Sequence, residues 1–578
     1  MQHIMKRNIK IYDIMKKRTM FLLIPIFFTA TSCKDFLDTT PEDGIGSLEM
    51  WTTPEHAALG IVGAYSPMKS FSQGADPYNP AGCIASNPVT DAYTKYAFAW
   101  GTGFDDTGCR YFCNNSATTG YGVFLSKWKA DYTGVQYANL AIENISRMEE
   151  ILDEDQFNKY LGEAHFLRAL YYFDLLTYYS GHKTSDPGIP LYTSMPDYDK
   201  AYRPRATPAN VRKVMIDDLE KAASLLPYRS YEKGRASRSA ALVLLGKVYL
   251  YSDNFAKAAE IFSALVEENN NSSEPYSLYG NYENLFKQEG ENNNEAVFVI
   301  DCLNTYGNGS RLDLLYSNRS ANCSGTNTSI PTRELVDAFL MSDGTPFNGV
   351  YPDWTNRDAV NQFFKNRDPR LDASIIRPFG LFVGKDNLTY EYRSPYDTKT
   401  SPYPCMRSNH SSNTNYCWRK FCNEGNETVI RRHSGIDIPL IRWADVLLLY
   451  AESLNESAGP SNAVFDALDA IRTRAKMPKV SRSGGQEEVR QLIRNERVYE
   501  LAGEGHLYPD WQRWFAHNDS DFDYESLTNQ PIAGYDGVAL ALLQVSTRNF
   551  TKRNWRYAIP QTEIDINPAL VQSDGWGN

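Results

Sequence analysis

The sequence predicts a mainly α-helical protein, in which paired helices form a frame that carries a large, irregular, loop-rich subdomain. Apolar residues recur at helical spacing through most of residues 127–268 and 439–502. One pair of these segments also has small and aromatic residues at the positions of a known helical repeat. In contrast, residues 70–125 and 270–435 are rich in Gly, Asn and Tyr and have no sustained period, which is typical of loops.

The N-terminal segment is typical of an exported bacterial lipoprotein. Residues 16–18 are basic, and residues 20–30 form a mostly apolar stretch that is too short for a membrane span, which needs ~20 residues. Small residues then precede Cys33, so we expect Cys33 to be the lipid attachment site and the first residue of the mature chain. An ordinary secretory signal with an incidental cysteine is the alternative, and either Met1 or Met15 can be the start.

The clearest single helix follows Thr207, because threonine is a favoured N-cap and Pro208 suits the first helical position. Its apolar residues recur at helical spacing from Val211 to Leu226 and stop before Pro227. Further helices are expected at residues 54–65, 127–151, 156–179, 236–252, 255–268, 439–456, 461–475 and 486–502, and a short strand at residues 296–300.

One helical pair has the signature of a tetratricopeptide repeat. Leu245, Gly246 and Tyr249 match its L-G-x2-Y positions, and Ala258 and Phe262 match its A-x3-F positions. Glycine lets two helices approach closely, while the aromatic rings fill the seam between them. A chance match is the alternative, because small and aromatic residues also occur on other helix pairs.

The composition excludes some classes of function and leaves others open. Lys plus Arg number 59 against 70 Asp plus Glu, and an acidic chain is a poor partner for nucleic acid. After Cys33, eight cysteines remain, and in an exported chain they permit disulfides without fixing the connectivity. No C-x2-C motif or helical histidine pair indicates zinc, so we predict no metal and no cofactor.

Two groups of aromatic and polar residues are candidates for ligand binding. The first contains Asp91, Tyr93, Tyr96 and Trp100, with Asn114 further along the chain. Aromatic faces can lie against the C–H face of a sugar while Asp and Asn bond its hydroxyls. The second group is Tyr306, Arg311, Tyr316 and Asn322. For any single tyrosine the alternative is packing of a loop onto the frame.

Three acidic residues form the strongest candidate for an enzyme. Glu496, Glu500 and Glu504 recur at i+4, and glycoside hydrolysis uses two carboxyl groups across a sugar ring. However, i+4 neighbours share one helical face, and Arg497 and Arg513 lie nearby in the sequence, so we interpret the trio as structural ion pairs. The chain also has no G-x-S-x-G, P-loop or H-E-x-x-H motif, and we predict no catalytic residue.

Several segments in consistent order resemble the SusD/RagB family of outer-membrane lipoproteins of Bacteroidetes. They include GEAHFLRALYYFDLL at 162–176 and IPLIRWADVLLLYAE at 438–452. The other matching segments are residues 33–38, 234–236, 331–339, 366–371, 494–497, 500–506 and 559–565. The resemblance implies a tetratricopeptide-like helical frame with ligand loops. It implies a signal peptide at residues 1–32, an N-terminal SusD-like region at 33–270 and a C-terminal region at 271–578.

The resemblance also implies a function. A SusD-like protein is expected to be lipid-anchored and exposed at the cell outer membrane, where it binds glycans or oligosaccharides and delivers them to a SusC-like TonB-dependent transporter. Two alternatives stay open: a surface lipoprotein that cleaves glycans, and a repeat scaffold that binds only protein. The glycan itself is not indicated, because loops rather than the frame set specificity.

Overall fold

The computed structural model describes residues 50–69, 82–99, 109–196, 200–305, 307–317, 325–354, 356–384, 387–392, 414, 416–425, 433–517, 528–535 and 542–577. The part from Trp51 onward is one compact unit and is described by itself.

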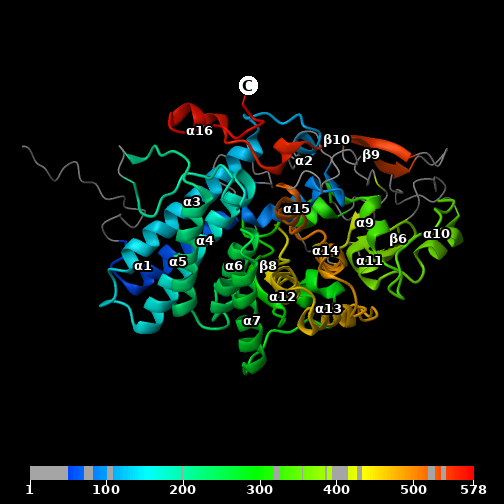
Figure 1. The fold of residues 1–578 in the computed structure, drawn as a ribbon, viewed down its shortest axis with the longest axis horizontal. Helices are drawn as coiled ribbons and strands as arrows, with labels where there is room; N and C mark the ends of the chain where they lie inside the picture. The colour runs from blue at the N-terminus through cyan, green and yellow to red at the C-terminus, as the bar shows by residue number, and fades with distance from the viewer. Residues whose placement is uncertain are drawn as a thin grey trace, which may run out of the picture. The chain divides into compact units, whose positions relative to one another are not determined.

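The frame is a succession of helices, each of which packs on the next. In order, α3 contacts α4, α4 contacts α5, α5 contacts α6, and α6 contacts α7, while α1 covers α3 and α4 (Figure 1). The bounds are α1 Pro54–Tyr65, α3 Gly122–Ile145, α4 Glu154–Tyr179, α5 Pro208–Leu225, α6 Arg238–Tyr251 and α7 Phe255–Asn271. These six helices confirm the mainly α-helical prediction, although α3 ends at Ile145 rather than at residue 151.

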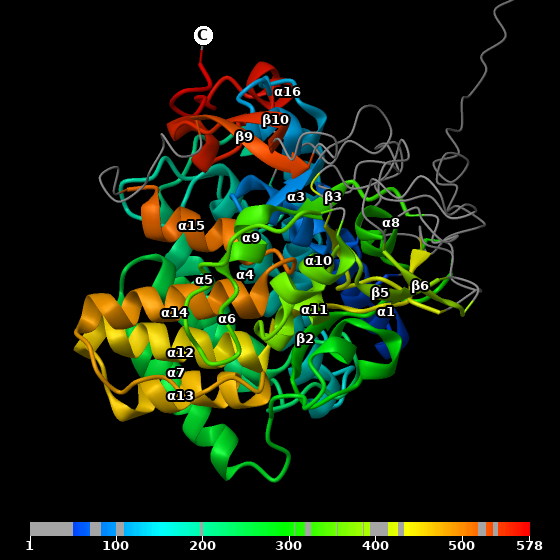
Figure 2. The same cartoon turned by 90° about the vertical axis from the view of Figure 1, so that its right-hand side faces the viewer.

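The frame continues after a long insertion. Helix α12 packs on α7, which precedes it by 171 residues, and also contacts α13 and α14. Their bounds are α12 Trp443–Ala458, α13 Asn462–Arg474 and α14 Gln486–Leu501. Figure 2 shows α14, α12 and α13 one below the other. The insertion therefore separates α7 from α12 in the sequence but does not prevent the two helices from packing together.

The start of α5 agrees with the sequence analysis in detail. The Thr207 hydroxyl accepts a hydrogen bond from the backbone N–H of Asn210, and Pro208 is the first helical residue. The apolar side of the helix is buried, since Val211, Met215, Leu219 and Ala222 are all fully inaccessible to solvent.

Two short strands bring the ends of the insertion together. Strand β2 (Ala296–Ile300) lies soon after α7, β8 (Ile438–Arg442) leads directly into α12, and the two pair antiparallel. The prediction of a strand at 296–300 is confirmed. The prediction of a helix from residue 439 is wrong for its first four residues. Pro439 and the β-branched Ile438 and Ile441 favour an extended chain, and the helix begins at Trp443.

The insertion itself has only short elements, as its composition indicates. Its helices are α8 Leu312–Tyr316, α9 Arg333–Ala338, α10 Arg357–Phe364 and α11 Pro369–Ser374. Its other strands are β3 Ser329–Pro331, β4 Ile375–Ile376, β5 Leu381–Val383, β6 Thr389–Glu391 and β7 Cys417–Trp418. Strand β4 pairs with β7 and β5 with β6, while β3 pairs with β1 (Ala97–Ala99), from the other irregular segment. The two loop-rich segments thus meet.

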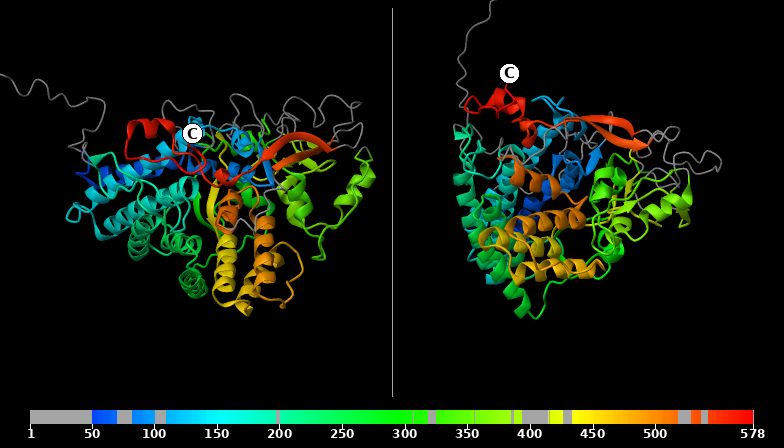
Figure 3. Two further views of the ribbon diagram at one scale, coloured as in Figure 1. Left: turned by 45° about the horizontal axis from the view of Figure 1, so that its top comes forward. Right: turned by 45° about the vertical axis from the view of Figure 1, so that its right-hand side comes forward.

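The C-terminal part holds elements that the sequence analysis did not predict. They are α15 (Leu507–Phe515), the antiparallel hairpin of β9 (Thr528–Tyr535) and β10 (Leu542–Asn549), and α16 (Gln561–Ile566). In Figure 3, as in Figure 2, this hairpin lies at the opposite end from α7 and α13. The short helix α2 (Cys109–Cys113) contacts β1.

Two further properties concern cysteines and membrane spans. Cys83, Cys113, Cys302, Cys417 and Cys422 are buried. Among the described residues, none of the helices combines the length and the apolar character that crossing a membrane requires.

The repeat-like pair of α6 and α7 provides a test of how the frame packs. A Cβ added at Gly246 would lie 2.6 Å from a ring atom of Phe262. We therefore expect Gly246→Ala to lower the free energy of unfolding by about 1–3 kcal/mol through overpacking, although alanine is the better helix former. Urea denaturation followed by circular dichroism measures the change.

Gly63→Ala in α1 is the matched control, because a Cβ at Gly63 meets no atom within 4 Å. We expect that variant to be neutral or stabilised by up to about 1 kcal/mol. Equal stability of Gly246→Ala and the parent protein would contradict the close approach of α6 and α7.

Candidate functional site

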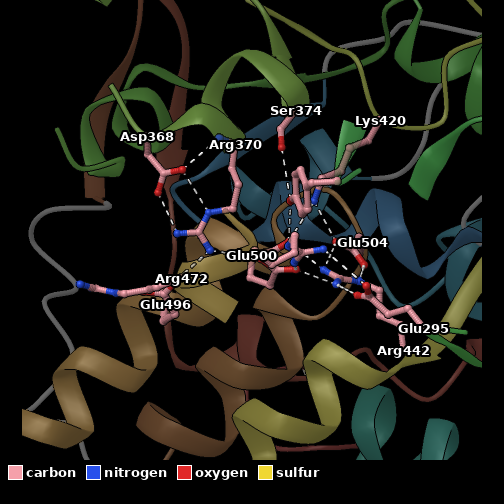
Figure 4. Close-up of polar contacts among 12 residues, drawn as sticks. Glu295, Asp368, Arg370, Ser374, Lys420, Arg442, Arg472, Glu496, Glu500 and Glu504 are labelled. Carbon is pink, nitrogen blue, oxygen red and sulfur yellow. Dashed lines mark hydrogen bonds and ion pairs between the residues drawn. The ribbon is translucent and has the colours of Figure 1, made fainter. Parts of the chain in front are cut away.

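The acidic trio Glu496, Glu500 and Glu504 is buried and paired with arginine side chains (Figure 4). Glu500 accepts hydrogen bonds from Arg442 Nη1 at 2.7 Å and from Arg370 Nη1 at 3.1 Å. Arg442 also donates from Nε to Glu504 Oε2 at 2.6 Å, and Arg370 Nη1 lies 2.7 Å from Glu496 Oε1. The trio is therefore ion-paired, as interpreted, but not with Arg497 and Arg513, which pair with other carboxylates.

The trio belongs to a larger cluster in which positive and negative charges balance. It contains five acidic side chains and five basic ones, and almost none of their surface is accessible. We call it the central ion cluster, formed by Glu295, Asp368, Glu496, Glu500 and Glu504 with Arg370, Lys420, Arg442, Arg472 and Arg474. Its members come from the insertion, α13, α14 and the turn after α14, so it joins the insertion to the frame.

The electrostatics of the cluster do not suit acid catalysis. Burial alone would raise the pKa of Glu500, but the guanidinium groups of Arg474, Arg442 and Arg370 outweigh burial and hold that pKa well below its usual range. A glycosidase acid needs a raised pKa so that it keeps a proton to donate. Glu500 is therefore a stable carboxylate that holds arginine side chains.

Asp91, predicted to bind ligand, is fully buried at the end of a 3-10 helix, Ile84–Tyr93. Its carboxylate accepts hydrogen bonds from the backbone N–H groups of Gly503, Gly505 and Leu507, at 2.8, 3.3 and 3.0 Å. Burial raises the pKa of Asp91 to about 7, although these three donors lower it. In this structure Asp91 holds the turn between α14 and α15.

Tyr316 lies at the same turn. Its hydroxyl donates to the carbonyl oxygen of Gly503 at 3.1 Å, and its buried ring stacks on Trp418 with centroids 5.6 Å apart. Arg311 is the N-cap residue of α8 and is also buried. The structure thus brings Asp91 and Tyr316, from the two predicted groups, to one turn as packing residues, and a direct ligand contact for them stays a prediction.

The remaining predicted residues lie in different surroundings. The Tyr93 hydroxyl is 2.5 Å from the Tyr557 hydroxyl in the buried core. Tyr96 is half-buried, with its ring edge-on to Trp511 at 5.9 Å between centroids. Asn114 is half-buried, and its Oδ1 accepts from a backbone N–H two residues later at 3.1 Å.

Trp100, Tyr306, Asn322 and Cys33 lie outside the described residues, so their predicted roles stay predictions. In the described part of the chain, no three His, Cys, Asp or Glu side chains meet in a way that could hold a metal ion.

An aromatic cluster around α15, which the sequence did not predict, extends the surroundings of Tyr96. Its buried members are Trp511, Phe550 and Trp555, and its half-buried members are Tyr96, Trp514, Phe515 and Ala516. Trp514 and Phe515 are half-buried, so part of each ring is accessible. Three aromatic residues within five positions of α15 could have indicated it. Because no helix was predicted there, they could not be assigned to one helical face.

Comparison with known proteins identifies two family models on this chain. A model described as the SusD family matches residues 269–576, and a model described as starch-binding associating with outer membrane matches residues 65–250.

Whole-chain relatives agree with these models. The chain is 24% identical to SusD-like protein P25 of Formosa agariphila, over 98% of this chain and 99% of that protein. It is also 24% identical to a SusD-like protein of Bacteroides ovatus, over 87% of this chain and 83% of that one.

Solved structures show the same fold. A SusD-like carbohydrate-binding protein from Bacteroides fragilis superposes with a TM-score of 0.73 at 24% identity, covering 90% of this chain and all of that one. A surface glycan-binding protein A from Bacteroides thetaiotaomicron gives a TM-score of 0.63 at 20% identity, covering 91% of this chain and all of that one.

The central ion cluster makes a quantitative prediction about stability. Replacing Glu500 with glutamine removes the charge that Arg370, Arg442 and Arg474 share, and leaves buried guanidinium groups uncompensated. We expect Glu500→Gln to lower the free energy of unfolding by about 3–5 kcal/mol, measured by urea denaturation. Glu220→Gln, at an exposed position of α5, is the control and should change it by less than about 0.5 kcal/mol. Similar losses in both variants would show that the cluster does not hold the fold together.

Proposed function

Because the chain belongs to the SusD family, we propose that it is a surface lipoprotein that binds glycans or oligosaccharides. It then delivers them to a SusC-like TonB-dependent transporter in the outer membrane. The observation that carries this proposal is the pair of family models, which together span most of residues 65–576, one of them described as starch-binding and associated with the outer membrane.

The proposed domain organisation follows the same family. Residues 1–32 are the signal peptide, residues 33–270 form the N-terminal SusD-like region, and residues 271–578 complete the frame and carry the second set of loops. The chain is anchored through lipid on Cys33 and exposed at the cell surface.

The structure favours binding over cleavage. The carboxylates best suited by sequence to a glycosidase, Glu496 and Glu500, are paired with arginine and closed off from solvent. By contrast, half-buried aromatic rings such as Tyr96 and Phe515 can offer apolar faces to a sugar. The ligand surface we propose includes these rings and the loops around residues 91–100 and 306–322.

One experiment separates the three classes of function. Saturable change of tryptophan fluorescence on titration with oligosaccharides, without release of reducing ends, supports glycan binding. Release of reducing ends that is lost in Glu500→Gln would support the cleaving lipoprotein instead. If neither signal appears over a panel of plant and microbial glycans, the protein-binding scaffold is the better description.

A variant at Trp100 tests where the ligand binds. In the run 91–100 its ring has the largest face, and removing such an anchor typically costs a few kcal/mol. We expect Trp100→Ala to weaken oligosaccharide binding in calorimetry at least about tenfold, with the helical circular dichroism spectrum unchanged. Tyr202→Ala, at an exposed aromatic residue outside these segments of the sequence, is the control. Unaltered affinity in Trp100→Ala would move the search to residues 306–322.

The proposed anchor has its own test. We expect Cys33→Ser to abolish incorporation of a tagged fatty acid and to move the protein from the membrane to the soluble fraction, because the thiol is the site of lipid attachment. Cys83→Ser keeps Cys33 and serves as the control, since Cys83 is buried in the folded chain. Label retained on Cys33→Ser would contradict the lipoprotein assignment.

A further inference from the structure

A charged hollow of about 270 Å³ lies among α12, α14, α15 and the connection between α6 and α7. Figure 2 shows α14 between α15 and α12, so this hollow belongs to the helical frame. None of the described residues that the sequence predicted as ligand contacts lines it. It is therefore separate from the loops proposed above to bind glycan.

Most charges on the wall of the hollow already neutralise one another. The pairs are Lys183 with Asp253 at 2.8 Å, Arg490 with Glu456 at 2.7 Å and also with Glu487, and Arg513 with Glu452 at 2.5 Å. Because each of these cations has its carboxylate, none of them needs a ligand.

Arg494 differs from the other cations on this wall. Within the described part of the chain, its guanidinium has no hydrogen bond or ion pair, and its Nε is buried without a partner. It lies over the Trp514 ring at 4.9 Å and near the Phe515 ring at 5.3 Å. Burial lowers the pKa of Arg494, and the attraction of Glu452 only partly offsets it. The residues that line the hollow include four cations and four carboxylates, and among these cations only Arg494 lacks a direct carboxylate partner.

The size and the remaining wall restrict what could bind there. A volume of about 270 Å³ is below the ~300–1,000 Å³ of sites for drug-sized molecules, which leaves room for a single ring with its substituents. Phe255 and Leu250 contribute an apolar side. The four wall carboxylates disfavour a divalent anion, whereas the guanidinium of Arg494, which has no direct partner, can pair with a single carboxylate.

We propose that this hollow is a second binding site, in which Arg494 receives the carboxylate of an acidic monosaccharide unit and the apolar wall contacts its ring. A guanidinium can donate two parallel hydrogen bonds to a carboxylate, which fixes the orientation of the ring as well as its charge. The choice of a sugar rests on the proposed function, while the choice of a carboxylate rests on Arg494.

The test is calorimetric titration of the mature full-length protein with sodium glucuronate, glucose and acetate. We expect glucuronate to bind saturably and glucose not to bind. We expect Arg494→Gln to weaken glucuronate at least about tenfold and Arg494→Lys to weaken it less, because lysine keeps the charge but not the paired donors. Arg147→Gln, at an exposed arginine just after α3, is the matched control and should bind glucuronate as the parent does.

Three results would overturn the proposal. They are the absence of saturable glucuronate binding, equal affinity of the parent and Arg494→Gln with the fold intact, and equal affinity for acetate and glucuronate, which would remove the sugar ring from the assignment. Titration of Arg494→Gln with neutral oligosaccharides distinguishes the two sites, because we expect this variant to bind them as the parent does. If no neutral glycan binds but glucuronate does, the loop site fails while the hollow stands.

Discussion

The pairing of Arg370 and Arg442 with Glu500 is the constraint on which the rest of the structure depends. Arg370 lies in α11 of the insertion, Arg442 is the last residue of β8, and Glu500 lies near the end of α14, so one buried carboxylate joins three distant parts of the chain. Burying charges is favourable only when every partner is in place, because each unpaired ion in the interior is costly. The cluster therefore ties correct placement of the irregular insertion to correct assembly of the helices.

The turn after α14 shows how the same logic extends to the loops. The carboxylate of Asp91 accepts hydrogen bonds from three backbone N–H groups there, and the hydroxyl of Tyr316 donates one to a carbonyl oxygen. Both residues come from irregular segments, so the loops are held by polar contacts to one turn of the frame. That turn also leads into α15, where Trp514 and Phe515 become partly exposed. The position of this turn thus sets where α15 and its aromatic side chains lie.

Much of the frame could be predicted from sequence because its information is local. Apolar spacing located α5, α6, α7, α13 and α14, and Thr207 with Pro208 marked one start correctly. The predictions that failed concern elements that local periodicity does not reveal. β8 exists because it pairs with β2, and α15 is short, so periodicity shows neither. At the candidate site, composition could not show whether Asp91 and Tyr316 are buried or exposed. Aspartate and tyrosine can form hydrogen bonds inside a packed loop as well as with a ligand. Arg494 stood out only once its neighbours were known.

The ladder between β2 and β8 has a consequence for how such a protein can diversify. Since these strands lie side by side, the chain between them leaves and re-enters the frame at one place. Closing a flexible loop costs only about 0.6 kcal/mol more for each doubling of its length. Surface segments in this insertion can therefore lengthen, shorten or change sequence while the helices keep their neighbours. The fold thus separates a helical scaffold from exchangeable loops, and new ligand preferences can arise by exchanging loops without a new architecture.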